Sequence, residues 1–324
     1  MAKQKRSNPT QQPRKQANAR SVTLRDWISG ARLRTLPLAV SPVLLGFASA
    51  VSAQPGEFHW VRALAALAVA LFLQIGVNYA NDYSDGVRGT DDVRVGPARL
   101  TGGGGVDPKQ VRNLAFFFFG LAAVAGLFLV VRTGQWWLLA IGVLAILAAW
   151  FYTGGKRPYG YAGLGEVFVF IFFGLVATVG TAYTQVLFVP SNAWVLGTAA
   201  GLFACAVLMV NNLRDLDQDR SAGKRTLAVL VGRGTGRIFF GVFALAPFVA
   251  TIMFMLVYPL SGFALFTLLI LGPAVVITST SETPRDLILA LKLTSLGSFA
   301  WAIIMAIGII VPNITPAVVP AYLG

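Results

Sequence analysis

An apolar run that ends in a cluster of acids decides the fold: ALAALAVALFLQIGV, residues 63–77, continues directly into NYANDYSDGVRGTDD, residues 78–92. The apolar part is typical of a helix that crosses a membrane, because about 20 such residues span the hydrocarbon core. Four aspartates and two asparagines follow it, although the chain has only 13 acidic residues among 324. Acids gathered at the end of a membrane span call for a functional explanation.

The composition of the whole chain agrees with a membrane protein. Hydrophobic residues make up 56% and charged residues 12%, whereas a soluble domain carries about 25% charged residues. The sequence therefore predicts an all-α polytopic membrane protein, built as a bundle of nine transmembrane helices. The expected spans are residues 35–53, 60–80, 111–131, 135–152, 164–185, 193–213, 237–258, 260–279 and 288–311.

The distribution of charge predicts the orientation of this bundle. With the N-terminus in the cytoplasm, only Arg62 and Arg132 of the 26 Lys and Arg residues lie outside. Glu57 is then the only one of the 13 acids on the outer side. Because cytoplasmic loops are enriched in Lys and Arg, we expect a multi-pass protein of the cytoplasmic (inner) membrane. Its ionic chemistry should lie on the cytoplasmic face.

The two ends of the chain differ in character. Residues 1–25 are polar and basic without an apolar stretch, so they predict a disordered cytoplasmic tail rather than a cleavable signal peptide. Beside a membrane span such a tail is expected to meet anionic lipid, and no nucleic-acid partner is predicted. Residues 26–324 form the membrane domain. One cysteine, Cys205, and one histidine, His59, exclude an intrachain disulfide and a zinc motif.

The first acidic cluster consists of Asn78, Asp82 and Asp85. These residues are spaced at i, i+4 and i+7, so on a helix they lie on one face. Asn81 precedes Asp82 and completes an Asn-Asp-x-x-Asp pattern. The sequence therefore predicts one oxygen-rich surface at the end of the second span.

The second acidic cluster, in NNLRDLDQDRSAGKRTLA (residues 211–228), consists of Asn211, Asp215 and Asp219. Its spacing of i, i+4 and i+8 again predicts one helical face, and Asp217 lies off that face. The segment begins like an EF-hand loop but has Arg220 where that loop needs glycine and lacks its final glutamate. Both clusters read Asn-x-x-x-Asp at the end of a span on the same side of the membrane.

Such clusters predict a site for a hard cation. Carboxylates on one face repel each other unless a cation lies among them, and oxygen-only ligands point to Mg²⁺ or Ca²⁺. Mg²⁺ is usually held by one or two carboxylates together with waters and a substrate phosphate. Two opposed faces can hold two Mg²⁺ ions bridged by a diphosphate. The alternative, two solvated helix ends, is weaker because the clusters are in register and share one side.

Basic and aromatic residues on the same side complete the candidate site. Most Lys and Arg there only set topology, but some lie inside or beside distinctive polar motifs. An aromatic ring in such a pocket can stabilise a cation. The candidates for substrate contact are Arg34, Arg88, Arg157, Arg214, Lys224, Asn212 and Tyr152, with Tyr79, Tyr83 and Tyr183 as further possible pocket aromatics.

These motifs resemble those of the UbiA superfamily of intramembrane prenyltransferases. The segments NDYSDGVRGTD, ARLRTLP, GPARL, GGKRPYGYAGLGE and NNLRDLDQDRSAGKRTLAV look like the branch that acts on 1,4-dihydroxy-2-naphthoate. The resemblance runs from about Ala31 to the last span. The aspartate that the superfamily usually carries four residues after Asp85 is Gly89 here, and Asp91 follows two residues later.

The resemblance implies a nine-helix fold and a specific activity. Asp82, Asp85, Asp215 and Asp219 would hold Mg²⁺ on a polyprenyl diphosphate, and Lys224 and Arg157 would assist the departing diphosphate. Asn78, Asn81, Asn211 and Asn212 would add ligands or supporting hydrogen bonds. The naphthoate ring would then take the prenyl group and lose carbon dioxide, giving demethylmenaquinol for menaquinone biosynthesis.

Other functions fit parts of the pattern. A related enzyme can use another acceptor, such as 4-hydroxybenzoate, haem, a chlorophyll precursor or a sugar phosphate. A cation-coupled transporter also places acids within the membrane, but its site belongs near the midplane, whereas these acids lie at one interface. A non-catalytic binding protein would not need both acidic clusters.

Overall fold

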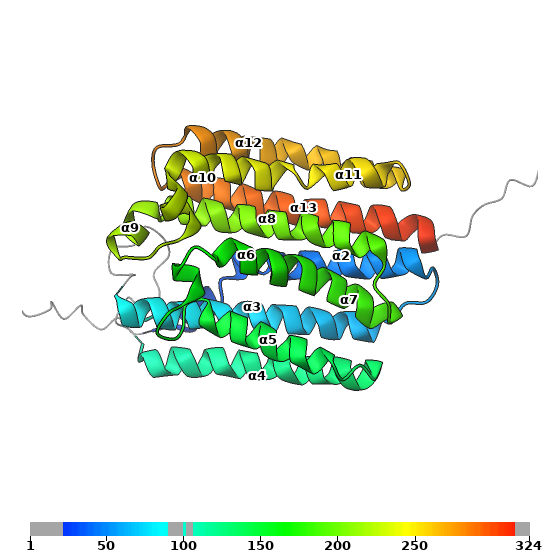
Figure 1. The fold of residues 1–324 in the computed structure, drawn as a ribbon, viewed down its shortest axis with the longest axis horizontal. Coiled ribbons are helices and arrows are strands. Elements are labelled where there is room, and N and C mark those ends of the chain that lie inside the picture. Colours follow the sequence, from blue (N-terminus) through cyan, green and yellow to red (C-terminus); the bar gives the residue numbers. More distant parts are fainter. Residues whose placement is uncertain (1–21, 90–99, 102–105, 315–324) are drawn as a thin grey trace, which may run out of the picture.

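The computed structural model describes residues 22–89, 100–101 and 106–314, and this part of the chain is helical without a strand. The long helices run side by side along one direction (Figure 1). The helices are α1 (Leu24–Gly30), α2 (Pro37–Ala53), α3 (Trp60–Arg88), α4 (Pro108–Thr133), α5 (Leu138–Phe151), α6 (Gly165–Val169), α7 (Ala177–Val186), α8 (Ser191–Arg214), α9 (Leu216–Ser221), α10 (Leu227–Leu245), α11 (Phe248–Met255), α12 (Leu268–Thr280) and α13 (Asp286–Ile314). The 3-10 turns η1 (Leu33–Thr35), η2 (Tyr159–Tyr161) and η4 (Pro259–Thr267) and the π-helical segment η3 (Phe170–Val176) connect them.

The helices confirm a multi-pass membrane protein. Within the described residues, seven continuous helices are long and apolar enough to cross a membrane. Three of them combine named elements: α6 with η3 and α7, α10 with α11, and η4 with α12. The bent pair of α1 and α2 counts as an eighth if it is one span. The remaining expected span, residues 135–152, contains α5, whose 14 residues are about 21 Å long at 1.5 Å per residue. Because α5 is shorter than the hydrocarbon core, the count of nine remains a prediction.

Several boundaries differ from those expected. α3 continues eight residues past its predicted end at residue 80, so the first acidic cluster is part of the helix itself. It stops where Gly89 adopts a left-handed conformation with φ of 73°, a common helix end. α1 begins at Leu24, inside the expected tail, because the Thr23 amide and hydroxyl both donate to the Asp26 carboxylate. Residues 1–21 of that tail lie outside the described residues.

Close helix packing holds α8, which carries the second acidic cluster. A Cβ added at Gly174 of η3 would lie only 2.6 Å from the Cα of Gly201 in α8. Small residues at such crossings let membrane helices approach closely. On another side of α8, Phe203 packs against the buried Trp301 of α13, with ring centroids 5.1 Å apart. α8 is therefore closely packed on two sides, and its C-terminal end carries the second acidic cluster.

Both acidic clusters lie at the same end of the bundle. The C-terminal end of α3 and the short helix α9 are at the left in Figure 1, whereas α13 ends at the right. We call this end of the bundle the α9 end. The fold thus brings together two segments that lie four spans apart in the sequence.

Candidate active site

A cavity of about 1030 Å³ lies within the bundle and has its acidic groups at the α9 end. Its apolar wall comes from α2, α3, α4, α5, η3 and α13. Most of the side chains that the sequence predicted for the site lie in its wall. These are Arg34, Asn78, Asn81, Asp82, Asp85, Tyr152, Asn211, Asn212, Arg214, Asp215, Asp219 and Lys224.

The first acidic cluster is buried on one face of α3, as its spacing predicted. Asn78, Asp82 and Asp85 are 3%, 2% and 4% exposed. The two oxygens of Asp82 accept hydrogen bonds from the backbone amides of Leu100 and Thr101, at 3.1 and 3.0 Å. Neutral backbone donors stabilise a buried carboxylate without cancelling its charge. Both oxygens of Asp82 are thus fixed in orientation beside the cavity.

Two further contacts join α3 to the segment between α5 and α6. The Thr153 hydroxyl donates to Oδ1 of Asn81 at 2.8 Å. The Tyr161 hydroxyl donates to Oδ1 of Asp85 at 2.6 Å. Because both partners belong to another part of the chain, the orientation of these α3 side chains depends on tertiary structure.

The second acidic cluster lies across a helix break rather than on one continuous helix, which corrects the sequence expectation. α8 ends at Arg214, and Asp215 has φ and ψ of −94° and 7°. Asp is a poor helix former, and here it caps α8 before α9 begins. The Asp215 amide still donates to the carbonyl of Asn211 at 3.2 Å, and the Asp219 amide to that of Asp215 at 2.8 Å. The four-residue spacing thus survives the break.

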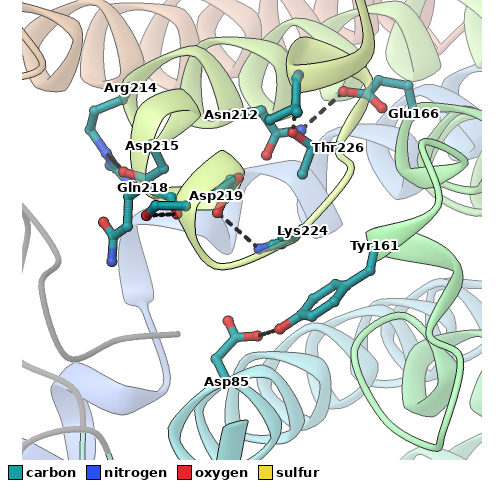
Figure 2. Close-up of polar contacts among 12 residues, drawn as sticks. Asp85, Tyr161, Glu166, Asn212, Arg214, Asp215, Gln218, Asp219, Lys224 and Thr226 are labelled. Carbon is teal, nitrogen blue, oxygen red and sulfur yellow. Dashed lines mark hydrogen bonds and ion pairs between the residues drawn. The ribbon is translucent and has the colours of Figure 1, made fainter. Parts of the chain in front are cut away.

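Cations accompany the carboxylates of this second cluster (Figure 2). Nε and one terminal nitrogen of Arg214 donate to the two oxygens of Asp215 at 2.7 and 2.6 Å. These two side chains are 5% and 11% exposed, so the pair is shielded from water. Lys224 Nζ lies 3.6 Å from Oδ1 of Asp219. Gly223, with φ of 73°, makes the turn that returns Lys224 to α9.

Burial raises the pKa of Asp219 to about 6. Lys224 opposes this shift by favouring the ionised carboxylate, while the negative charges of Asp215 and Asp85 add to it. Asp85 of the first cluster and Asp219 of the second line the same cavity, so their negative charges repel each other. A cation between them would relieve that repulsion.

Glu166 and Asn212 form a buried pair beside the second cluster. The Asn212 side-chain amide donates to Oε1 of Glu166 at 3.1 Å, and both residues are buried. This bond uses one of the two N–H donors of Asn212, which leaves its second N–H and its carbonyl oxygen for other contacts. Glu166 therefore orients a side chain of the cavity wall.

Two predicted site residues lie outside the cavity wall in this structure. The Arg88 guanidinium donates to the carbonyls of Thr153 and Gly155, and its side chain is exposed. Arg157 is exposed in the turn that follows. In this structure those two carbonyls take the donors of Arg88, and its contact with substrate stays a prediction. The structure gives no support to a catalytic role for Arg157.

The other aromatic candidates divide between the two ends of the bundle. The Tyr79 hydroxyl donates to the Trp27 carbonyl and the Tyr183 hydroxyl to Gln135, both outside the cavity wall. The Tyr83 ring stacks on Trp150. Asp91, Asp92, Arg99 and the glycine run 102–105 lie outside the described residues.

Tyr159, Tyr161 and Gln218 are among the residues that sequence reasoning missed, and the ring of Tyr159 lines the cavity. Gln218 lies in the cavity wall on α9, and Tyr161 contacts Asp85. Tyr161 stands in a glycine-rich turn with no periodic signal, so only its place beside the Lys-Arg-Pro motif could have suggested a role. Within the described residues, no three Asp, Glu, His or Cys side chains converge on a single metal position.

Comparison with known proteins identifies the family. Residues 39–285 match the UbiA prenyltransferase family. The chain belongs to the UbiA prenyltransferase family. This UbiA protein is 45% identical over 281 residues to the 1,4-dihydroxy-2-naphthoate octaprenyltransferase of Mycobacterium tuberculosis, covering 86% of this chain and 95% of that protein. It is 37% identical over 234 residues to the enzyme of that name from Escherichia coli, covering 70% and 75% of the two chains.

Solved UbiA structures share the fold. A UbiA homolog from Aeropyrum pernix aligns with a TM-score of 0.64 at 18% identity, covering 85% of this chain and 97% of that one. A UbiA homolog from Archaeoglobus fulgidus bound to DMAPP and Mg²⁺ aligns with a TM-score of 0.53 at 15% identity, covering 85% and 99%. At this identity the likeness establishes the helical architecture of this UbiA protein.

Proposed function

We propose that this UbiA protein transfers a polyprenyl group from polyprenyl diphosphate to 1,4-dihydroxy-2-naphthoate, releasing diphosphate and carbon dioxide. The product is demethylmenaquinol, a precursor of menaquinone. The observation that carries the transfer reaction is the long apolar cavity with two acidic clusters and cationic side chains at one end. The choice of acceptor rests on the 45% identity to a 1,4-dihydroxy-2-naphthoate octaprenyltransferase over nearly its whole length.

The two ends of the cavity suit the two parts of a prenyl diphosphate. The apolar wall, which includes side chains of α2, α4 and α5, provides a surface for the isoprenoid chain. Lys224 and Arg214 at the α9 end provide positive charge for the diphosphate. Since charge-assisted hydrogen bonds to phosphate oxygens are strong, the donor should bind with its reactive carbon near the acidic clusters.

Mg²⁺ fits the donor set at this end. The candidate ligands are all oxygens, from Asp82 and Asp85 on α3 and from Asp215 and Asp219 beside α9, and hard divalent cations prefer oxygen. No three acids converge among the described residues, so diphosphate oxygens and waters would complete the coordination, as is usual for Mg²⁺. When bound, Mg²⁺ supplies charge stabilisation for the leaving diphosphate.

The side chains of the cavity suit the chemistry of the transfer. The bond between the allylic carbon and oxygen breaks, with its electron pair leaving on the diphosphate, and Lys224 and Arg214 stabilise the charge that develops there. The rings of Tyr152 and Tyr159 line the cavity with centroids 5.5 Å apart, and aromatic faces stabilise an allylic cation. The surrounding apolar wall keeps water from that cation.

The acceptor ring forms the new bond. Its carboxylate-bearing carbon attacks the allylic carbon, and the bond to the carboxylate then breaks as carbon dioxide leaves, so that its electrons restore the aromatic ring. Arg34 in the cavity wall is our candidate partner for that carboxylate before it leaves. The charge pattern of the loops further suggests that this site faces the cytoplasm from the inner membrane.

A single assay tests the proposal. The purified protein is given Mg²⁺, a polyprenyl diphosphate and a panel of aromatic acceptors, and the products are identified by mass. We expect a prenylated naphthoquinol that has lost its carboxyl group, and release of one diphosphate per product. Prenylated 4-hydroxybenzoate would reassign the acceptor, and no diphosphate release with any acceptor would refute prenyl transfer.

A further inference from the structure

Tyr161 touches the first acidic cluster from outside the cavity wall. Its hydroxyl donates to Oδ1 of Asp85 at 2.6 Å, across 76 residues of sequence (Figure 2). A short hydrogen bond from a hydroxyl to a carboxylate is among the stronger kinds in proteins. Because the bond uses Oδ1, it also fixes the direction in which Oδ2 of Asp85 points.

The ring of the same tyrosine touches the second half of the site. Lys224 Nζ lies 5.0 Å from the ring centroid, and the guanidinium carbon of Arg88 lies 5.1 Å from it. Cations at this distance are attracted to an aromatic face. Lys224 is also paired with Asp219, so the contacts run from Asp85 through Tyr161 and Lys224 to Asp219. Figure 2 marks the first and the last of these contacts with dashed lines.

Backbone contacts hold the tyrosine in register with that second half. The Arg225 amide donates to the Tyr161 carbonyl at 3.1 Å, and the Lys224 amide donates to the Asp219 carbonyl at 2.8 Å. Gly223 and Gly163, with φ of 73° and 78°, permit the turns on either side. The turn that carries Tyr161 and the turn that carries Lys224 are thus hydrogen-bonded to each other.

We propose that Tyr161 is a positioning residue that sets Asp85 and Lys224 for binding of a divalent cation with a diphosphate. The inference rests on the proposed function, because it assigns the ligand of that same site. Tyr161 does not line the cavity, so it acts through Asp85 and Lys224 rather than on the substrate. A tyrosine that merely packs would affect the melting temperature but not the affinity for the cation.

Calorimetry on the full-length protein in detergent tests this role. MgCl₂ is titrated in the presence of inorganic pyrophosphate for the wild type, Tyr161→Phe and Tyr161→Leu. Tyr161→Phe keeps the ring but removes the bond to Asp85, so the Mg²⁺ midpoint should rise about tenfold, as expected for one hydrogen bond to a charged group. Tyr161→Leu also removes the ring and should raise the midpoint about threefold further.

Tyr183→Phe is the matched control. It likewise deletes a tyrosine hydroxyl that donates a hydrogen bond, to Gln135 at 2.9 Å, but outside the cavity wall. Its Mg²⁺ midpoint should equal that of the wild type. A wild-type midpoint in folded Tyr161→Phe would overturn the positioning role alone. Absence of magnesium pyrophosphate binding by the wild type would overturn the proposed function and this inference with it.

Discussion

The cluster at the end of α3 and the cluster at the junction of α8 and α9 share an Asn-x-x-x-Asp spacing, but the protein holds their acids in different ways. Asp82 is held by the backbone amides of Leu100 and Thr101, and Asp85 by the hydroxyl of Tyr161. Asp215 and Asp219 are instead paired with the cations Arg214 and Lys224. The first cluster lies on a continuous helix, and the second lies across a break.

This difference suggests that the two clusters have different roles in binding a metal ion and a diphosphate. Hydrogen bonds from neutral groups orient the carboxylates of Asp82 and Asp85, and oriented carboxylate oxygens suit a divalent metal ion. The second cluster brings two cations with its carboxylates, so it can contact both a metal and the oxygens of a diphosphate. The break at Asp215 lets the chain turn back at Gly223 and carry Lys224 to the cavity. Four experiments can separate these roles.

The largest effect is expected from removing a carboxylate of either cluster. Asp82→Ala and Asp215→Ala should each lower prenyl transfer by about 1000-fold or more, because metal and diphosphate are no longer held together. The measurement is product formation by mass with the purified variants. Melting curves and membrane insertion serve as controls for folding. Normal turnover by either variant would show that its cluster is not part of the site.

A smaller effect is expected from removing the cation of the second cluster. Lys224→Met should raise KM for polyprenyl diphosphate about 30-fold, because a charge-assisted contact to the diphosphate is lost. Arg220→Met is the matched control, since Arg220 is exposed on α9 and outside the cavity wall. If the two variants have the same KM, Lys224 does not contact the donor.

The pH dependence of metal binding should report on Asp219. Its pKa is raised to about 6, so a proton competes with Mg²⁺ below that pH. Apparent Mg²⁺ affinity should therefore fall about tenfold from pH 7 to pH 5, through the loss of ionised Asp219. Calorimetric titrations at several pH values check this. The same pH dependence in Asp219→Asn would assign the proton to another group.

The smallest effect is expected at Asp217, between the two carboxylates of the second cluster. Its side chain is 74% exposed and pairs with Arg233 at 2.8 Å. Exposed ion pairs contribute little, so Asp217→Ala should change turnover by less than about threefold and stability by less than about 1 kcal/mol. A loss as large as that of Asp215→Ala, measured in the same assay, would refute the face assignment.

Local pattern predicted the parts of the site that lie on one helix. The spacing of Asn78, Asp82 and Asp85 placed them on one buried face of α3, and the structure confirms it. Pattern could not place the side chain of Arg88, whose guanidinium donates to backbone carbonyls 65 and 67 residues away. Such partners come from another helix end, and no periodicity within α3 identifies them.

The sequence by itself determined the membrane class, the approximate position of most helical spans and the presence of two acidic clusters. Apolar run length and helical spacing are local properties, so they can be read without a fold. Only the tertiary structure decided that the clusters face one cavity, that α8 breaks at Asp215 and that Tyr161 joins Asp85 to Lys224. These features depend on how distant helices pack, because hydrogen bonds and ion pairs act over a few ångströms of space whatever the separation in sequence.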